Sequence, residues 1–425
     1  MMKHIVRAVL VALLGALCLE AALAQAPRVI PRPPPSPPQG SAPELGSIAT
    51  DGYAPIPARA GQTRAPRPDV VAAYEVQTFA TGLAGGFSFH FLPDGRLLVA
   101  ERPGRVKLIG LDGHVSQPLG GLPPIWAQGP QGLVEALPDR DFARNRVLYL
   151  AYTVRPEGSP EPPPREAGLL VVARARLSAD ERTIEDVKVL LNAEGPGGRV
   201  IQARDGTLLV ASSIPAGVGI DSSDWPQPQQ LDSLMGKVLR INTDGSIPRD
   251  NPFVGRAGAR PEIYAYGFRD DAGVAIHPRT GKLWASEHGP KGGDEINAIE
   301  KGKNYGFPVI GYGHEYNGKP INHDRTVEPG MEQPVYFWTP DIAPSGMSFY
   351  TGKLFPAWQG NLFVAALAGK HLARLVLNGE RVIGEERLLA NLEQRIRDVQ
   401  QGPDDALYVL VDGNAGRILK LVPKK

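Results

Sequence analysis

The densest group of chemically useful side chains lies between residues 261 and 308. This stretch contains two short β-type runs, at 262–266 and 282–286, and each is followed by a loop rich in Gly, Pro, Asp and Glu. The charged residues of these loops include Arg269, Asp270, Asp271, Glu287, His288, Asp294 and Glu295. Buried strands next to loops that carry charge are the usual layout of a functional site on a rigid scaffold.

Four of the loop residues could bind a hard cation. The backbone oxygens of Gly289 and Pro290, together with the carboxylates of Asp294 and Glu295, would form the all-oxygen ligand set that suits Ca²⁺. An acidic surface loop without a metal explains the same spacing equally well. We expect the neighbouring His288 to be a hydrogen-bonded structural histidine rather than a ligand.

The composition indicates an all-β protein and excludes some partners. The 425 residues include 49 Gly and 42 Pro, which suits many short strands joined by turns. The 46 Lys and Arg residues balance 45 Asp and Glu, for a formal charge of +1. There is therefore no electrostatic case for binding nucleic acid or an anionic membrane.

The first residues have the anatomy of a cleavable signal peptide, predicted at residues 1–24. A basic leader at 1–7 precedes an apolar run at 8–19, and Ala22-Leu23-Ala24 supplies a small-x-small cleavage signal. The only cysteine, Cys18, lies within the apolar run, so the mature chain would have no disulfide. These features predict a periplasmic or secreted protein without a membrane span.

A Pro-rich segment follows at residues 25–69. It contains no apolar run that could contribute to a core, which predicts a disordered, polyproline-like linker. We expect the folded domain to occupy residues 70–425.

Within that domain a turn rich in Pro, Asp and Gly, followed by a short apolar strand, recurs six times. Clear copies lie at 92–99, 204–210, 277–284 and 402–409, and looser copies lie at 138–149 and 355–364. Irregular spacing of such copies predicts a six-bladed β-propeller with long inter-blade loops. A β-sandwich is the alternative, but its strands should repeat more closely.

Longer motifs resemble the soluble PQQ-dependent sugar dehydrogenases, which are glucose/sorbosone dehydrogenase-like six-bladed propellers. The matching segments follow the family order over nearly all of the chain after Val70. They are FLPDGRLLVAERPGRVKLI (91–109), PDRDFARNRVLYLAY (138–152), LDSLMGKVLRINTDGSIPRDNPF (231–253), the 261–308 stretch, VYFWTPDIAPSGMSFYTG (335–352) and RIRDVQQGPDDALYVL (395–410). The resemblance implies a periplasmic enzyme that oxidises an aldose at C1 to the lactone, using a PQQ cofactor that lies over Ca²⁺.

The resemblance also implies roles for individual residues. Arg269 would face the quinone oxygens, and Arg395 and Arg397 would bind the cofactor carboxylates. Lys370 and Gln131 are the nearest matches to a cofactor-binding lysine and glutamine. The remaining assignments are Trp338 at the substrate rim, Gly289 and Pro290 at the cofactor-side Ca²⁺, and Asp294 and Glu295 at a second Ca²⁺.

Several family residues are replaced in this chain. Gly195 stands where the family has its catalytic histidine, Asp270 replaces an asparagine, and Val411 replaces a threonine. Loss of a general base typically slows catalysis by about 10²–10⁴-fold, so the resemblance predicts impaired turnover. Glu194 and Asp270 are the candidate substitute bases, because a carboxylate near apolar walls can have a near-neutral pKa.

Two other functions remain open at this point. One is a non-catalytic propeller that binds a sugar, polymer or protein, which the loss of the histidine favours. The other is a Ca²⁺-dependent lactonase, since unrelated six-bladed propellers hydrolyse lactones at a channel-mouth metal. For the redox function the partner is a small sugar, while the sequence identifies neither the electron acceptor nor the oligomeric state.

Overall fold

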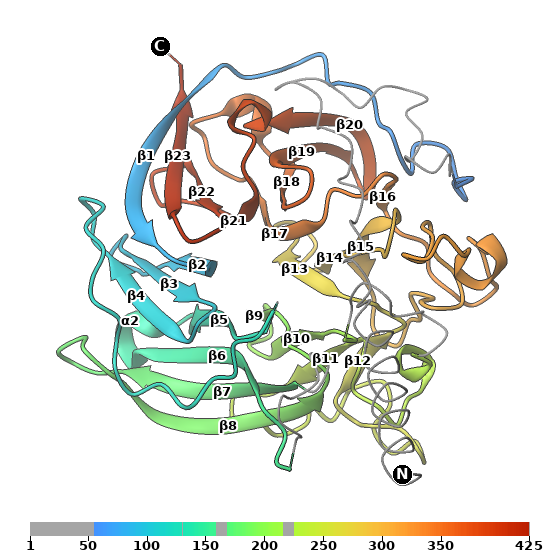
Figure 1. Cartoon of the computed structure of the whole chain (residues 1–425), viewed down its shortest axis with the longest axis horizontal. Coiled ribbons are helices and arrows are strands. Elements are labelled where there is room, and N and C mark those ends of the chain that lie inside the picture. Colours follow the sequence, from blue (N-terminus) through green and yellow to red (C-terminus); the bar gives the residue numbers. More distant parts are fainter. Residues whose placement is uncertain (1–54, 130, 159–167, 216–224, 425) are drawn as a thin grey trace, which may run out of the picture. The chain divides into compact units, whose positions relative to one another are not determined.

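The computed structural model describes residues 55–129, 131–158, 168–215 and 225–424. The predicted signal peptide and residues 25–54 of the predicted linker lie outside the described residues. The described part is almost entirely β and forms six sheets, five of four strands and one of three. These sheets are the blades of a propeller (Figure 1), which confirms the predicted fold class.

Each blade is an antiparallel sheet in which strands adjacent in the chain pair with one another. Blade 1 holds β2 (Gly86–Phe91), β3 (Leu97–Glu101) and β4 (Arg105–Ile109). Blade 2 holds β5 (Leu133–Pro138), β6 (Val147–Val154), β7 (Leu169–Leu177) and β8 (Ile184–Glu194), with the short helix α2 (Phe142–Asn145) between β5 and β6. Blade 3 holds β9 (Val200–Gln202), β10 (Leu208–Ser212), β11 (Lys237–Ile241) and β12 (Ile263–Tyr266).

The second half of the ring repeats the arrangement. Blade 4 holds β13 (Asp271–Ile276), β14 (Leu283–Glu287), β15 (Asp294–Ile299) and β16 (Tyr336–Trp338). Blade 5 holds β17 (Pro344–Phe349), β18 (Leu362–Ala366), β19 (His371–Asn378) and β20 (Arg381–Leu388). Blade 6 holds β21 (Ile396–Gln401), β22 (Leu407–Val411) and β23 (Gly416–Pro423), and β1 (Tyr74–Leu83) is its fourth strand.

Strand β1 closes the ring. It pairs antiparallel with β23, from Tyr74 opposite Pro423 to Leu83 opposite Gly416. Segments from the two ends of the propeller sequence therefore share one sheet, as the blue and red strands of Figure 1 show.

The recurring turn signature marks the first hairpin of each blade. In blades 1, 3, 4 and 6 it connects the first strand to the second, and the backbone closes it with hydrogen bonds such as Leu92 N–H to Arg96 O. Gly95 and Gly206 adopt φ of +86° and +89° in two of these turns, which is why the Asp-Gly pairs recur. The looser copies lie in blades 2 and 5, so the six copies correspond to the six blades.

The core is divided among the junctions between neighbouring blades. Six clusters of buried apolar side chains occur in the described residues, one for each pair of adjacent blades around the ring. Each blade thus buries both faces, which explains why the second strand of most blades is a continuous apolar run. Rigid blades of this kind fix the loops at the two ends of the central channel.

The innermost strand of each blade lines the channel. These strands are β2, β5, β9, β13, β17 and β21, and each is an edge strand of its sheet. We call the end of the channel where they begin the proximal face, and the end where they finish the distal face.

The last part of the predicted linker is docked on the propeller rather than disordered. Gln62 is only 1% exposed, and its side-chain amide donates to Pro334 O at 2.9 Å. Phe337 N–H donates to Gln62 O, and the Ala65 N–H donates to the hydroxyl of Tyr336. Although residues 55–69 lack an apolar run, their backbone groups find partners on blades 4 and 5. The prediction of disorder is therefore wrong for these residues.

Candidate active site

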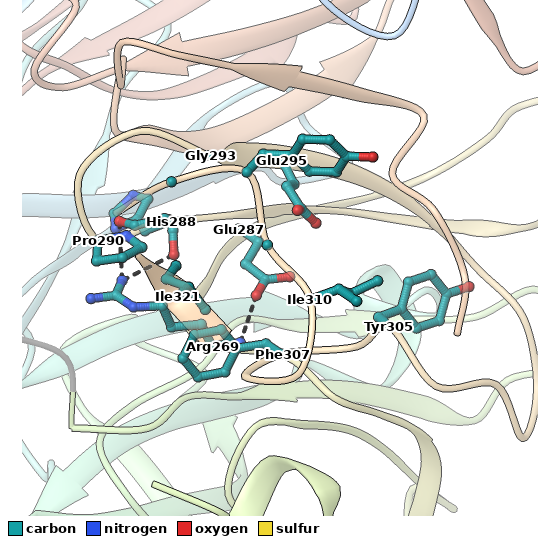
Figure 2. A pocket seen from close by; sticks show the side chains of 14 residues that line it. Arg269, Glu287, His288, Pro290, Gly293, Glu295, Tyr305, Phe307, Ile310 and Ile321 are labelled. Atoms are coloured by element: carbon teal, nitrogen blue, oxygen red, sulfur yellow. Dashed lines mark hydrogen bonds between the residues drawn. The ribbon is translucent and has the colours of Figure 1, made fainter. Parts of the chain in front are cut away.

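A cavity on the proximal face brings together much of the predicted site. It lies between the loops before β13 and after β14 and the loop that follows β15 (Figure 2). Its lining includes Arg269, Glu287, His288, Gly289, Pro290 and Glu295. Residues predicted from one stretch of sequence thus surround one hollow.

Arg269 lies in the wall of this cavity and makes contacts with β14 and the loop after it. Its side chain reaches the loop after β14, where Nη1 donates to the carbonyl oxygens of His288 at 2.9 Å and Gly289 at 3.2 Å (Figure 2). Its backbone N–H donates to the Glu287 carboxylate at 2.6 Å. The residue is only 6% exposed, so a permanent positive charge is held at the cavity wall with its orientation fixed.

Asp270 forms an ion pair with His288 and is not a near-neutral base. The Oδ2 atom lies 3.2 Å from His288 Nδ1, and His288 Nε2 lies 2.5 Å from Pro344 O. Burial raises the pKa of Asp270, but the hydrogen bond and charge of His288 and the charge of Arg269 outweigh it and lower the pKa to about 2. So low a pKa makes Asp270 a weak base and argues against the predicted base role near pH 7. His288 is hydrogen-bonded, as expected.

Glu194 lies away from the cavity. It is the last residue of β8, the outermost strand of blade 2. Its carboxylate accepts a hydrogen bond from Leu234 N–H at 3.0 Å and lies 3.7 Å from Arg260. The side chain therefore stabilises the loop before β11, and the prediction of a base role for Glu194 finds no support in its position.

Gly195 has a backbone that a histidine could not adopt without strain. Its φ is +91°, and a Cβ atom built on it would lie 2.4 Å from Ser213 O. Both the dihedral angle and the contact oppose any side chain at this position. The replacement of the family histidine is thus accompanied by a local backbone suited to glycine.

A row of three carboxylates crosses blade 4 beside Arg269. Asp271 on β13 pairs with Glu287 on β14, which pairs with Glu295 on β15. All three are at most 9% exposed, and both carboxylate oxygens of Asp271 lack a hydrogen-bond partner. Burial and mutual repulsion raise the pKa values of Asp271 and Glu287, and burial raises that of Glu295 to about 7.

Sequence reasoning assigned a role only to Glu295 in this row. Asp271 and Glu287 were recognised as charged loop residues, but the strand register that aligns them is set by pairing across blade 4. A signal was present, because each of the three residues is the first or last of a short strand, or next to its first residue. Adjacent antiparallel strands place such ends side by side.

Asp294, by contrast, uses its carboxylate to organise loops. Its Oδ1 accepts the Gly289 N–H at 2.9 Å, and its Oδ2 accepts the N–H groups of Ile342 and Ala343 at 2.7 Å each. Within the described residues, no three Asp, Glu, His or Cys side chains are arranged to hold a metal ion. A cation here would need the carbonyl oxygens of Gly289 and Pro290 in addition to side chains.

The predicted arginine pair lies at the start of β21 in blade 6. Arg395 and Arg397 both reach Asp412, with nitrogen–oxygen distances of 2.9 and 3.2 Å. The Arg397 guanidinium also lies 4.6 Å from the centre of the Phe87 ring. The two arginines share the proximal end with Arg269, but they do not line its cavity.

The other predicted contacts are dispersed. Lys370 is exposed in the tight turn between β18 and β19, with φ of +52°. Gln131, just before β5, is 2% exposed and lies against Gly168. Trp338 is 3% exposed, and its indole N–H donates to Glu385 at 3.2 Å. Trp338 therefore belongs to the core between blades 4 and 5, and the prediction that it forms a substrate rim is wrong.

Comparison with known proteins identifies relatives of this arrangement. Residues 83–420 match the family model described as glucose/sorbosone dehydrogenase. The chain is 38% identical over 363 residues to the aldose sugar dehydrogenase YliI of Escherichia coli, covering 83% of this chain and 94% of that protein.

Solved structures give the same result. The crystal structure of a glucose dehydrogenase is 40% identical, with a TM-score of 0.75 and coverage of 83% of this chain and all of the other. The PQQ-bound form of the aldose sugar dehydrogenase from Streptomyces coelicolor is 25% identical, with a TM-score of 0.65 and coverage of 83% and 99%.

The chain belongs to the glucose/sorbosone dehydrogenase family of six-bladed propellers. The relatives named above are sugar dehydrogenases, which are oxidoreductases, so a small sugar is the kind of substrate that the family implies. In the part of the chain that the structure describes, no helix is long and apolar enough to span a membrane.

Proposed function

We propose that this protein is a PQQ-dependent aldose dehydrogenase that oxidises a sugar at C1 to the lactone, with the quinone held over Ca²⁺ on the proximal face. The observation that carries the proposal is the placement of cations and carbonyl oxygens at one end of the channel. Arg269 and the Gly289 carbonyl are hydrogen-bonded neighbours, and Arg395, Arg397 and Lys370 belong to the same end of blades 5 and 6.

The arginines fit a planar, multiply anionic cofactor. Guanidinium groups bind carboxylates in a fixed bidentate geometry and keep their charge at any physiological pH. The Arg395 side chain is 49% exposed and so has donors available beyond its contact with Asp412. Asp412 would share Arg395 and Arg397 with the cofactor, because one carboxylate does not saturate two guanidinium groups.

The carboxylate row fits a divalent cation. Asp271 is 2% exposed and its two carboxylate oxygens have no hydrogen-bond partner, an expensive arrangement unless a positive charge or a proton is nearby. Ca²⁺ prefers six to eight oxygen ligands, and many of these can be carbonyl groups or water. We assign the ion to Glu295 and the carbonyl oxygens of Gly289 and Pro290, with Asp271 and Glu287 supplying negative charge behind them.

The bound quinone would supply the chemistry of hydride acceptance, so that the C1 hydrogen leaves with two electrons and the C1 hydroxyl proton leaves separately. This chain places no side chain at Gly195 to take that proton, and Asp270 is too weak a base with a pKa of about 2. We therefore propose that the proton is lost to water and that turnover is slow. We also propose a periplasmic or secreted location, on the basis of residues 1–24.

The test is a PQQ titration with and without Ca²⁺, followed by dye-linked oxidation of aldoses. We expect saturable quinone binding that requires Ca²⁺, and measurable but slow dye reduction. Arg269→Ala should weaken quinone binding at least tenfold, because it removes a charge-assisted contact. Arg325→Ala is the matched control, because Arg325 pairs only with Glu328 among the described ion pairs, on an exposed loop. A protein that binds no quinone and reduces no dye would contradict the proposal.

A second candidate is a non-catalytic propeller that binds a sugar or another partner. The absence of a side chain at Gly195, where the backbone suits only glycine, and the pairing of both arginines with Asp412 favour it. In that case the same titration would give no quinone binding, while sugar binding without turnover would be detected by calorimetry.

A further inference from the structure

A second cavity lies in the channel at the distal face. It has a volume of about 210 Å³ and is lined by residues from the inner strands of all six blades. These include His90 on β2, Leu137 on β5, Ile201 on β9, Ile276 on β13, Ser348 on β17 and Gln400 on β21. They lie in the second half of most of these strands, whereas Arg269, Asp271 and Arg397 lie before or near the strand starts. The cavity is therefore separate from the proximal site.

A buried polar network forms part of the wall of this cavity. Glu135 lies 2.7 Å from His90 Nε2 and 3.1 Å from Arg199 Nε, and Arg199 lies 3.2 Å from Asp398. Glu135, Arg199 and Asp398 are at most 3% exposed. Gly346 lets Asp398 approach, because a Cβ atom there would lie 1.7 Å from the carboxylate oxygen. These charged groups form ion pairs with one another across the inner strands of blades 1, 2 and 6 and the start of blade 3.

The network fixes the orientation of the His90 ring. Two carboxylates surround one guanidinium. Burial raises the pKa of Glu135, but the charges of Arg199 and His90 outweigh it and lower the pKa to about 2, so this carboxylate is ionised. An ionised carboxylate only accepts hydrogen bonds, so the His90 Nε2 carries the proton that faces Glu135. This contact holds the His90 ring in a fixed orientation, and leaves Nδ1 as the ring nitrogen that can form a further hydrogen bond.

The wall of the cavity combines the His90 ring with other polar groups and apolar surface. Ser348 and Gln400 add groups that both donate and accept, and both are partly exposed. Leu137, Ile276 and Phe349 supply apolar surface around them. Concave sites with apolar walls and a few convergent polar groups are the usual binding sites of small molecules.

We propose that the distal cavity binds a small, neutral, cyclic polyol, with His90 Nδ1 hydrogen-bonded to one of its hydroxyl groups, which can either donate or accept. Hydroxyls match the mixed donors and acceptors of Ser348 and Gln400, and the C–H face of a ring matches the apolar wall. An anion is disfavoured, because Arg199 is already shared by Glu135 and Asp398. The proposal is independent of the redox function, because it uses neither the proximal residues nor a cofactor.

The experiment uses myo-inositol, a cyclic polyol with no aldehyde-level carbon for a dehydrogenase to oxidise. Binding to the whole protein, without quinone or Ca²⁺, is measured by saturation-transfer NMR and calorimetry. We expect saturable binding by the unmodified protein and at least tenfold weaker binding by Ser348→Phe, which places a ring in the cavity. Gln400→Leu should also weaken binding while leaving the cavity volume similar.

Controls separate the two ends of the channel and the effect of misfolding. Lys370→Ala, on the proximal face, should leave inositol binding unchanged. Circular dichroism and the melting temperature establish that each variant is folded, and Gln400→Leu provides the answer if Ser348→Phe is not. Absence of saturable binding, or binding that survives both distal variants, would overturn the proposal. Loss of binding in Lys370→Ala alone would place the polyol at the proximal face and would overturn it too.

Discussion

At the scale of single residues, the site of this chain differs from the family pattern at Gly195 and Asp270. At Gly195 the missing histidine is matched by a positive φ and by the Ser213 carbonyl oxygen, which lies 2.4 Å from the point where a Cβ atom would stand. At Asp270 a carboxylate has been added, yet His288 and Arg269 hold it in its charged form. Both positions have neighbours that suit the residue present, so neither change is isolated from its surroundings.

The first prediction concerns restoration of the family histidine. Gly195→His should lower the free energy of unfolding by about 1–3 kcal/mol and should not raise dye-linked sugar oxidation, because the side chain meets Ser213 O. Gly206→His is the matched control, since Gly206 has a similar φ of +89° but no atom within 4 Å of a Cβ. A tenfold gain in oxidation by Gly195→His would mean that the segment relaxes to accept a base.

The second prediction concerns Glu135 and acid stability. Its folded pKa of about 2 lies below its ordinary value of 4.5, so its contribution is complete above about pH 4.5 and is lost as the pH falls toward 2. Glu135→Gln should therefore destabilise the protein by about 2–4 kcal/mol at pH 7, and by less at pH 3. Urea unfolding at the two pH values measures the difference. The groups that face Glu135 are His90, Arg199 and Ser88, with Asp398 beyond Arg199.

At the scale of elements, pairing between strands brings together carboxyl groups that no single strand contains as a set. The register of β13, β14 and β15 aligns Asp271, Glu287 and Glu295 into one buried row. Loops held by Asp294 then set the Gly289 carbonyl beside Arg269. The row brings together three buried carboxyl groups whose pKa values are raised, and a bound cation would stabilise their ionised forms.

The third prediction follows from this row. Removal of divalent cations by a chelator should lower the melting temperature, and added Ca²⁺ should restore it, because an ion that binds only the folded state stabilises it. Glu295→Gln should reduce the Ca²⁺-dependent shift. Glu300→Gln is a suitable control, because Glu300 lies just after β15 and pairs with Lys282 on the exposed side. Equal Ca²⁺ shifts in both variants would rule out the assignment to Glu295.

The turns and blades could be predicted from the sequence more accurately than the contacts that their side chains make with one another. Repeated turns predicted six blades because Asp-Gly pairs impose positive φ locally, and the Asp94-Gly95 and Asp205-Gly206 turns are present as expected. The family resemblance assigned both Arg269 and Gly289 to the cofactor site, and the structure joins them by a hydrogen bond. Trp338 could not be placed in this way, because its direction depends on packing against Glu385 from the next blade. The docking of residues 55–69 was missed because backbone hydrogen bonds leave no apolar pattern.

At the scale of the whole molecule, closure of the ring depends on one seam, which is the pairing of β1 with β23. Strand β1 completes blade 6, and the segment before it crosses to blades 4 and 5, where Gln62 and Ala65 are buried. The N-terminal part of the described chain therefore makes stabilising contacts with three blades, which are blades 4, 5 and 6. The other blades are built from consecutive strands and have no comparable dependence on distant sequence.

The fourth prediction separates the contribution of the docked segment at residues 55–69 from that of strand β1. A chain that begins at residue 74 should lose the contacts of the docked segment and melt several degrees lower. A chain that begins at residue 84 should also lose β1, expose the edge of β23, and melt much lower or aggregate. Calorimetry and light scattering measure the two effects. Equal melting temperatures for the two truncated chains would show that β1 contributes little to the ring.

The seam between β1 and β23 also imposes an order of events during biosynthesis. The first blade-forming strand to leave the ribosome is partnered by the last, so the circle stays open until translation has reached the final residues. Any prematurely terminated product would keep β1 without its partner and would present bare strand edges to other chains. An incomplete copy of this protein is thus marked, by its own topology, for capture by chaperones or for aggregation.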